Sequence, residues 1–193
     1  MKLLAHTATL FAAASFLALA GCTQMDAHSG STAINPWANI SEAVAVIKPT
    51  AGNKCEGVVH FVTEAGGVHV KGSISNLEPN SEHAFHIHEL GDISGADGMS
   101  TGGHYNPEGH KHGGPHDAMH HAGDFGNVKA DAGGVAHIDF VVSDISVSGD
   151  KNPIVGRGLI LHAKADDLKT QPTGNAGGRI GAGVIGVAKP AAK

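Results

Sequence analysis

The chain has 193 residues, of which 41% are hydrophobic and 16% are charged, and its formal net charge at pH 7 is −5. The hydrophobic share is enough for a packed core and excludes wholesale disorder, while the lack of a basic excess argues against a nucleic-acid-binding protein. The 28 glycines and an aromatic content of 4% favour short strands joined by turns over long helices. Histidine is the unusual residue, because 15 histidines outnumber the 13 lysines and arginines together. Metal binding is therefore the first function to consider.

The N-terminal residues have the layout of an export signal. Lys2 is followed by a mainly apolar stretch that is too short and too interrupted for a transmembrane span. The stretch ends in Leu19-Ala20-Gly21-Cys22, which resembles a bacterial lipobox, so we expect residues 1–21 to be removed and Cys22 to carry a lipid. An ordinary secretory signal with an incidental cysteine is the alternative. The expected location is the periplasm or cell envelope, with the lipid of Cys22 in the outer membrane because Thr23 rather than Asp follows it.

Residues 22–40 are mostly small and polar and are predicted to form a flexible tether, followed by a single domain over residues 41–190. β-rich runs in this domain are separated by turn residues such as Gly66-Gly67 and Gly133-Gly134. They predict an all-β antiparallel sandwich or barrel without a helix. Two long segments, residues 89–123 and 163–178, are predicted to be functional loops. The expected strands cover residues 43–47, 57–62, 68–74, 84–88, 124–130, 134–142, 155–162 and 184–187.

Histidines gather in and beside these two loops. His86 and His88 are two residues apart in a strand, so their side chains share one face and can bind one metal ion. Imidazole suits copper and zinc, and a carboxylate among histidines completes an acceptable zinc site. The two cysteines of the chain are too few for an iron–sulfur cluster or a cysteine-type zinc site. Further potential ligands follow along the chain: His104, His112, His121, Asp124 and His162.

Several short blocks around these residues resemble, in order, the copper/zinc superoxide dismutase family. The resemblance runs from about residue 41 to residue 188, and it implies an eight-stranded Greek-key β-sandwich or barrel. It also implies an enzyme with one copper and one zinc ion in each subunit. The blocks are Ala84–Glu89 (AFHIHE), Gly103–Pro107 (GHYNP), His112–Pro115 (HGGP), His121–Asp124 (HAGD), Leu161–Leu168 (LHAKADDL) and Gly174–Arg179 (GNAGGR).

The resemblance also assigns roles to individual residues. It makes His104 a ligand of both metals, Asp166 a carboxylate that orients one ligand of each metal, and Arg179 the cation that guides the substrate anion. The implied copper ligands are His86, His88, His104 and His162, and the implied zinc ligands are His104, His112, His121 and Asp124.

The implied reaction is the dismutation of superoxide to dioxygen and hydrogen peroxide by alternating reduction and oxidation of copper. His104 leaves copper and takes up a proton in the first half of the cycle, and zinc is structural. A metal buffer without turnover is the alternative, but it would be expected to lack His104 or Arg179, and both are present. Residues 154–156 and 183–186 match stretches that pair subunits in eukaryotic-type members, which favours a homodimer.

The chain departs from the family at the usual intrachain disulfide. The first half-cystine position falls within residues 95–98 and the second is Ala182, and neither is a cysteine. If Cys22 is acylated, Cys55 has no partner within the chain, although two Cys55 residues could pair between chains. The remaining histidines, His60, His69, His83, His137 and the loop trio His110, His116 and His120, are expected to be exposed and neutral. A metal-uptake site is the alternative for the trio.

Overall fold

The computed structural model describes residues 40–189, so the predicted signal peptide, Cys22 and almost the whole tether lie outside the described residues. Within this part of the chain there are eight strands and one short 3-10 turn, η1 (Met99–Thr101). None of its segments forms a helix that is long and apolar enough to cross a membrane. The strands are β1 (Glu42–Pro49), β2 (Glu56–Glu64), β3 (Gly67–Ser75), β4 (Glu82–His88), β5 (Asp124–Lys129), β6 (Ala136–Val142), β7 (Gly158–His162) and β8 (Arg179–Val187).

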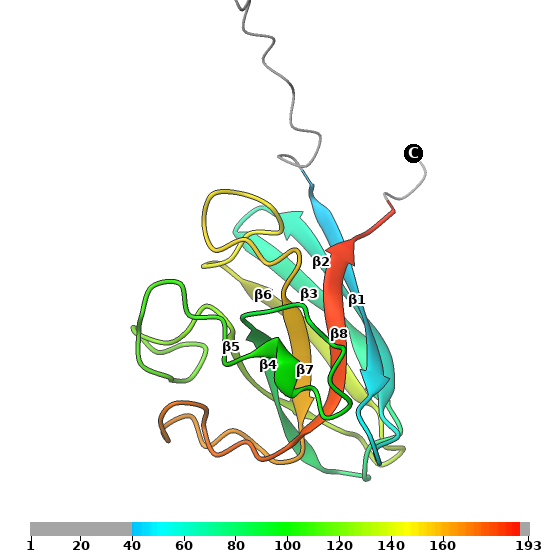
Figure 1. Ribbon diagram of the computed structural model, residues 1–193. Helices are drawn as coiled ribbons and strands as arrows, with labels where there is room; N and C mark the ends of the chain where they lie inside the picture. The colour runs from blue at the N-terminus through cyan, green and yellow to red at the C-terminus, as the bar shows by residue number, and fades with distance from the viewer. Residues whose placement is uncertain (1–39, 190–193) are drawn as a thin grey trace, which may run out of the picture. The chain divides into compact units, whose positions relative to one another are not determined.

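All neighbouring strands are antiparallel, in the order β5-β4-β7-β8-β1-β2-β3-β6. The sheet curls until β5 and β6 approach each other without a hydrogen-bonded ladder, which makes a nearly closed barrel (Figure 1). The connections from β3 to β4 and from β6 to β7 cross the barrel, because each joins strands that are not neighbours in the sheet. The predicted all-β Greek-key class with eight antiparallel strands is confirmed.

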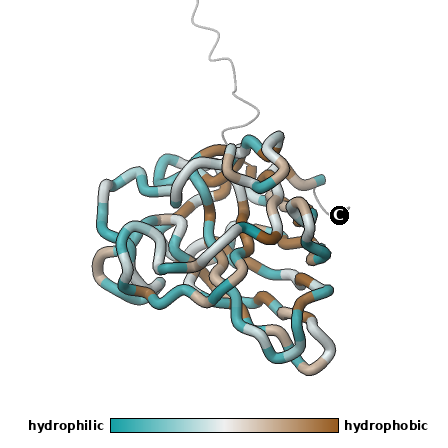
Figure 2. Tube along the Cα trace, turned by 60° about the horizontal axis from the view of Figure 1, so that its bottom comes forward, coloured by the Kyte–Doolittle hydropathy of each residue, from teal (hydrophilic) through white to brown (hydrophobic). Residues whose placement is uncertain are grey.

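The core follows an alternation of buried and more exposed residues along β1, β2, β3 and β6. In β1, for example, Ala43, Ala45 and Ile47 are fully buried, whereas Val46 is 48% exposed. This alternation is the two-residue period of a strand with one face on the core. Figure 2 shows hydrophobic stretches toward the middle of the domain and hydrophilic ones along its loops.

β4 and its neighbour β7 depart from this alternation because both are buried on both faces, and β4 carries two histidines of the site. Phe85 and Ile87 point into the core, while His86 and His88 on the opposite face are covered by the long loops. Figure 1 shows these loops, residues 89–123 and 163–178, on the same side of the barrel beside β4 and β5. A strand buried on both faces therefore carries a row of histidines away from bulk water.

The observed strand ends differ from the predicted ones mainly around β7 and β8. β7 begins at Gly158 rather than at residue 155, because Gly156 adopts a left-handed conformation with a φ of 87° and ends the preceding turn. The connection between β6 and β7 therefore covers residues 143–157 rather than the expected 143–154. β8 begins at Arg179 rather than at residue 184, since it pairs with both β7 and β1 along its length. Its glycines conceal the strand in the sequence.

Candidate metal centre

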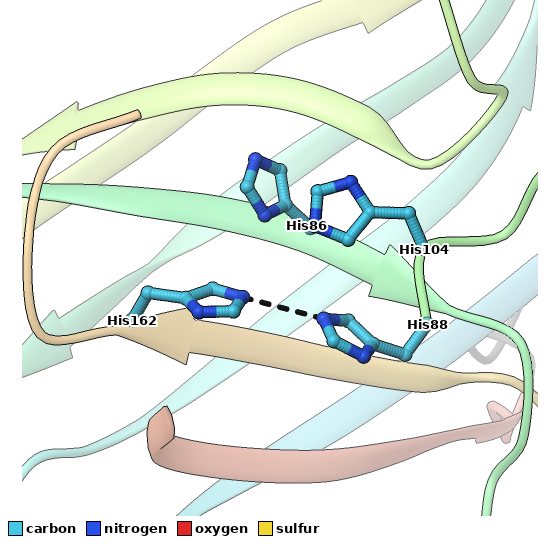
Figure 3. Close-up of side chains that lie close together, drawn as sticks. All are labelled: His86, His88, His104 and His162. Atoms are coloured by element: carbon cyan, nitrogen blue, oxygen red, sulfur yellow. Dashed lines mark hydrogen bonds between the residues drawn. The ribbon is translucent and has the colours of Figure 1, made fainter. Parts of the chain in front are cut away.

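Three histidines on neighbouring strands form the base of the site. His86 and His88 come from β4, and His162 ends β7, which pairs with β4. His104 joins them from the long loop, where it forms an isolated antiparallel bridge with His88. Figure 3 shows these four rings gathered over the two strands.

The ring nitrogens of these four residues converge. One nitrogen from each of His86, His88, His104 and His162 lies within 4.8 Å of the others. His88 Nε2 is 3.3 Å from His162 Nε2. Two further nitrogens, His86 Nδ1 and His104 Nε2, are buried and have no hydrogen-bond partner. Buried polar atoms are normally paired, so unpaired nitrogens that face one point indicate a ligand set for a metal ion.

A second cluster is centred on the carboxylate of Asp124. Its oxygens lie 2.7 Å from His104 Nδ1, 3.0 Å from His112 Nδ1 and 3.3 Å from His121 Nδ1. The last two nitrogens approach the carboxylate without hydrogen-bond geometry. Ligands about 2.0 Å from one tetrahedral ion are roughly 3.3 Å apart, so this spacing fits a zinc ion among the four side chains.

The structure thus brings all seven predicted ligands into two adjacent clusters that share His104. The shared ring presents Nδ1 to the Asp124 cluster and Nε2 to the other cluster. Three imidazoles with one carboxylate suit zinc, and four imidazoles suit copper. The donor sets therefore fit the two metals that the sequence predicts. The assignment of each metal to its cluster stays a prediction.

Asp166 links the two clusters from behind. Its Oδ2 accepts a hydrogen bond from His86 Nε2 at 2.8 Å, and its Oδ1 accepts one from His112 Nε2 at 2.9 Å. Each ring is thereby oriented with its Nδ1 toward a metal cluster. Gly174 makes room for this carboxylate, because a Cβ there would overlap Asp166 and lie 2.7 Å from His112 Nε2.

Burial keeps three rings of the first cluster, those of His88, His104 and His162, neutral. Burial, with the charge of Arg179 and the nearby rings of His162 and His104, lowers the pKa of His88 to about 2. Burial and neighbouring imidazoles lower the pKa of His162 to about 3. The pKa of His104 falls to about 4, mainly through burial, although Asp124 opposes the shift. Neutral imidazoles are the form that binds metal.

The carboxylates have the opposite effect on the second cluster. Burial alone would lower the pKa of His112, but its close contacts with the carboxylates of Asp124 and Asp166 outweigh burial and raise it to about 9. Burial likewise opposes ionisation of Asp124 and Asp166, yet their hydrogen bonds with histidines hold both pKa values well below the ordinary range. Both carboxylates are therefore ionised, and a bound cation would replace the proton of His112.

Arg179 lies at the start of β8 beside the first cluster. Its Nη1 donates to Gly98 O at 2.6 Å and to Thr101 Oγ1 at 2.9 Å, and its Nη2 donates to Gly102 O at 2.6 Å. Burial lowers the pKa of Arg179, but a guanidinium remains protonated in proteins. These bonds hold the positive charge of Arg179 in a fixed position between β8 and the loop of residues 89–123.

Three supporting residues were not identified from the sequence. The Asn127 amide exchanges two hydrogen bonds with the backbone of Asp166, at 2.6 Å and 2.9 Å. The Gln171 amide does the same with the backbone of His112, at 2.9 Å and 2.8 Å. Thr101 contacts Arg179. No spacing or composition signal marks them, because each acts on a partner that lies far away in the sequence.

Four of the remaining histidines differ from the expectation of exposed rings, because His83 is buried and His69, His110 and His120 are half-buried. His83 is buried rather than exposed, with Nδ1 2.8 Å from His162 O, because it lies on the same face of β4 as the core residues Phe85 and Ile87. His69 lies between Asp139, 2.7 Å from Nε2, and Glu64, 3.1 Å from Nδ1. Both hydrogen bonds raise the pKa of His69, so it is not a simple neutral surface residue.

The loop trio does not form a ligand set within the described residues. His110 Nδ1 is 3.2 Å from His120 O, so it contacts backbone rather than a second ring. His116 and His120 line a cavity of about 660 Å³ that also touches Asp124. Cys55 is buried and free, and burial raises its pKa to about 11. A buried thiol does not fit the suggested pairing of two Cys55 residues between chains.

Comparisons with known proteins agree with this geometry. The profile of the copper/zinc superoxide dismutase (SODC) family matches residues 55–185. A protein of Paramecium bursaria Chlorella virus 1 named superoxide dismutase [Cu-Zn] is 42% identical over 158 residues, which cover 78% of this chain and 82% of the viral protein. The crystal structure of the clock protein EA4 matches with a TM-score of 0.69 and 45% identity, over 77% of this chain and 95% of that one.

The fold and the site define a β-barrel metalloprotein with two adjacent metal-binding clusters joined by one imidazole. The profile match and the viral relative then make the particular assignment. The chain belongs to the copper/zinc superoxide dismutase family. It is accordingly an oxidoreductase that acts on superoxide, with copper and zinc as its cofactors.

Proposed function

We propose that the chain dismutates superoxide at a copper ion held by His86, His88, His104 and His162, while His104, His112, His121 and Asp124 hold a structural zinc. The observation that carries this proposal is the shared His104, whose two nitrogens face the two clusters. When bound, copper supplies one-electron chemistry by alternating between its cupric and cuprous states, whereas zinc has no redox chemistry.

His104 is the residue that handles the proton in this proposal. Its Nε2 is buried, has no other partner and faces the copper cluster, so a proton taken up there stays at the reacting centre. Its Nδ1 remains directed at the Asp124 cluster, which prevents the ring from turning away. The ring can therefore hold a proton at Nε2 in one half of the cycle and release it to peroxide in the other.

Arg179 is proposed to guide and dock the anion. Its charge is fixed by three hydrogen bonds and lies near enough to His88 to lower the pKa of that ring. A fixed cation at the rim of a buried site attracts small anions, and this attraction is weakened by salt. Binding of superoxide and its rate of encounter would both depend on this side chain.

The test compares metal-loaded wild type, Arg179→Ala and the control Lys48→Ala, which removes an exposed lysine of β1. Arg179→Ala should retain copper and zinc but lose most activity, and salt should slow wild type more than the variant. Lys48→Ala should behave like wild type. Equal activity of wild type and Arg179→Ala at low salt would reject guidance by Arg179. Wild type that holds both metals but consumes no more superoxide than free copper would instead favour a metal buffer.

We also propose that the chain is exported and anchored to the outer membrane through a lipid on Cys22, with residues 22–40 as the tether. The support is the lipobox-like sequence at residues 19–22, which lies outside the described residues. Cells fed labelled palmitate should incorporate label into wild type but not into Cys22→Ser, and only wild type should fractionate with the outer membrane. Label in the Cys22→Ser variant, or none in wild type, would reject the anchor.

A homodimer is proposed from exposed apolar side chains next to the predicted pairing stretches. Leu90, Ile93 and Val187 are 50%, 43% and 43% exposed. Gly91 lies against Gly156 and close to Val184, so the predicted pairing stretches lie next to the start of the long loop. Exposed apolar side chains beside these stretches favour association with a second copy of the same chain. Sedimentation equilibrium should give a dimer for wild type and a monomer for Leu90→Lys, and a wild-type monomer at all concentrations would contradict the proposal.

A further inference from the structure

The hydroxyl of Thr101 lies between the guide arginine and a copper-cluster histidine. Thr101 is fully buried at the end of η1. Its Oγ1 donates to Gly98 O at 2.9 Å, accepts from Arg179 Nη1 at 2.9 Å and lies 3.3 Å from His88 Nδ1. A hydroxyl has one donor and two acceptor positions, so these three partners use its full capacity.

The same group of atoms sets the orientation of His88. Its Nδ1 donates to Gly102 O at 2.9 Å, with the Thr101 hydroxyl as a second acceptor. This pattern places the proton on Nδ1 and leaves Nε2, which faces His162, free for a metal ion. Arg179 Nη2 donates to that same Gly102 carbonyl. Arg179 and His88 are therefore held by one short piece of loop.

We propose that Thr101 is a positioning residue that couples the orientation of Arg179 to that of His88, so that the anion guide stays aligned with the copper cluster. This inference rests on the proposed function, in which the cluster holds copper and Arg179 docks the anion. Thr101 touches neither the substrate nor the metal. It acts through the two residues that do.

The need for such a residue follows from the missing family disulfide. Residues 95–98 and Ala182 offer no cysteine pair, so noncovalent contacts hold this part of the loop to the barrel. Besides the Arg179 bonds, the backbone contact from Ala51 N to Ala96 O, at 2.7 Å, serves this purpose. A buried hydroxyl that satisfies the arginine and the loop together restricts both without a covalent bond.

The two parts of the Thr101 side chain can be separated by mutation. The methyl group packs against Gly158, where an added Cβ would come within 3.0 Å of it. Thr101→Val retains the methyl and removes the hydroxyl, whereas Thr101→Ser retains the hydroxyl and removes the methyl. Thr50→Val is the matched control, because the Thr50 hydroxyl donates to the main-chain carbonyl of Arg179, at 2.7 Å, and not to the guanidinium.

The experiment measures the binding of azide, a small anionic probe, to the copper- and zinc-loaded protein. Its dissociation constant is taken from the azide-to-copper absorption band, and the geometry of the copper site from the electron paramagnetic resonance spectrum. Loss of a hydrogen bond to a charged group should weaken azide binding about tenfold in Thr101→Val and shift the copper spectrum. Thr101→Ser and Thr50→Val should stay close to wild type. The double variant Thr101→Val/Arg179→Ala should bind azide no more weakly than Arg179→Ala alone.

Azide affinity in Thr101→Val equal to wild type, with Arg179→Ala clearly weakened, would overturn the role of Thr101 and leave that of Arg179 intact. Equal losses in Thr101→Val and Thr101→Ser would also overturn it, since packing would then be the cause. Unchanged azide affinity in Arg179→Ala would instead reject the proposed guide. If Thr101→Val does not fold, Thr101→Ala compared with Thr101→Ser isolates the hydroxyl in the same way.

Discussion

Replacement of Asp166 by Asn tests the link between the two metal clusters. The carboxylate accepts from His86 Nε2 at 2.8 Å, from His112 Nε2 at 2.9 Å and from Leu168 N at 2.7 Å. An amide has one oxygen and one NH2 group, so it cannot accept from both rings in this geometry. One ring must face a donor, and the simplest relief moves its proton from Nε2 to Nδ1. Nδ1 is the nitrogen that faces the metal cluster in both residues.

The size of the effect follows from what is removed. Loss of an outer hydrogen-bond partner of a metal ligand typically costs 10- to 100-fold in metal affinity, which is about 1.4–2.7 kcal/mol. We expect Asp166→Asn to weaken the binding of at least one metal by this amount. The barrel should stay folded, because Asp166 lies in a loop outside the core strands.

The assay is competition with a chromophoric chelator, run separately for zinc and copper. The control is Asp139→Asn, which removes a carboxylate 2.7 Å from a surface histidine, His69, on the outside of the barrel. Wild type and control should bind both metals equally. If Asp166→Asn retained wild-type affinity for both, the reasoning that this carboxylate orients the ligands would be refuted.

Removal of zinc should lower the melting temperature of the protein and raise its amide hydrogen exchange in the long loop. The rise should be larger in residues 106–121 than in residues 89–104, because residues 89–104 are also hydrogen-bonded to β8. An equal rise in both segments would contradict this. Added reductant should change neither result. Gly174→Ala should weaken zinc binding in the same chelator assay, because φ is +67° at Gly174 and an added Cβ would overlap the carboxylate of Asp166. Gly178→Ala is the control and should leave zinc binding unchanged, because an added Cβ there would meet open space. The raised pKa of His69 means that its ion pairs stabilise the fold fully below its unfolded pKa of about 6.5 and less as pH rises through the folded pKa. Urea unfolding should therefore show a larger loss for His69→Asn at low pH than at high pH, and a pH-independent difference would contradict the pairing.

The two-residue period was sufficient to predict the class and most of the strands, and the resemblance of the histidine blocks to a known family supplied the members of both clusters. This information is local, because alternation along a strand decides which side chains face the core and puts His86 and His88 on one face. The weakest strand predictions were β7 and β8, where glycines and a left-handed turn conceal the boundaries. The burial of His83 was missed because the expected strand began only at residue 84, whereas β4 begins at Glu82 and alternation then places His83 on the face of Phe85 and Ile87.

What the tertiary structure decided is how the clusters are held. Asp166 reaches His86 across 80 residues of sequence and His112 across 54, and Arg179 reaches Gly98 across 81. Contacts at such separations depend on loop paths that no periodic pattern encodes, because loop backbones are set by side-chain and backbone bonds to distant strands. The direction of each imidazole nitrogen, and the place of Thr101 between the arginine and a ligand, follow from those paths alone.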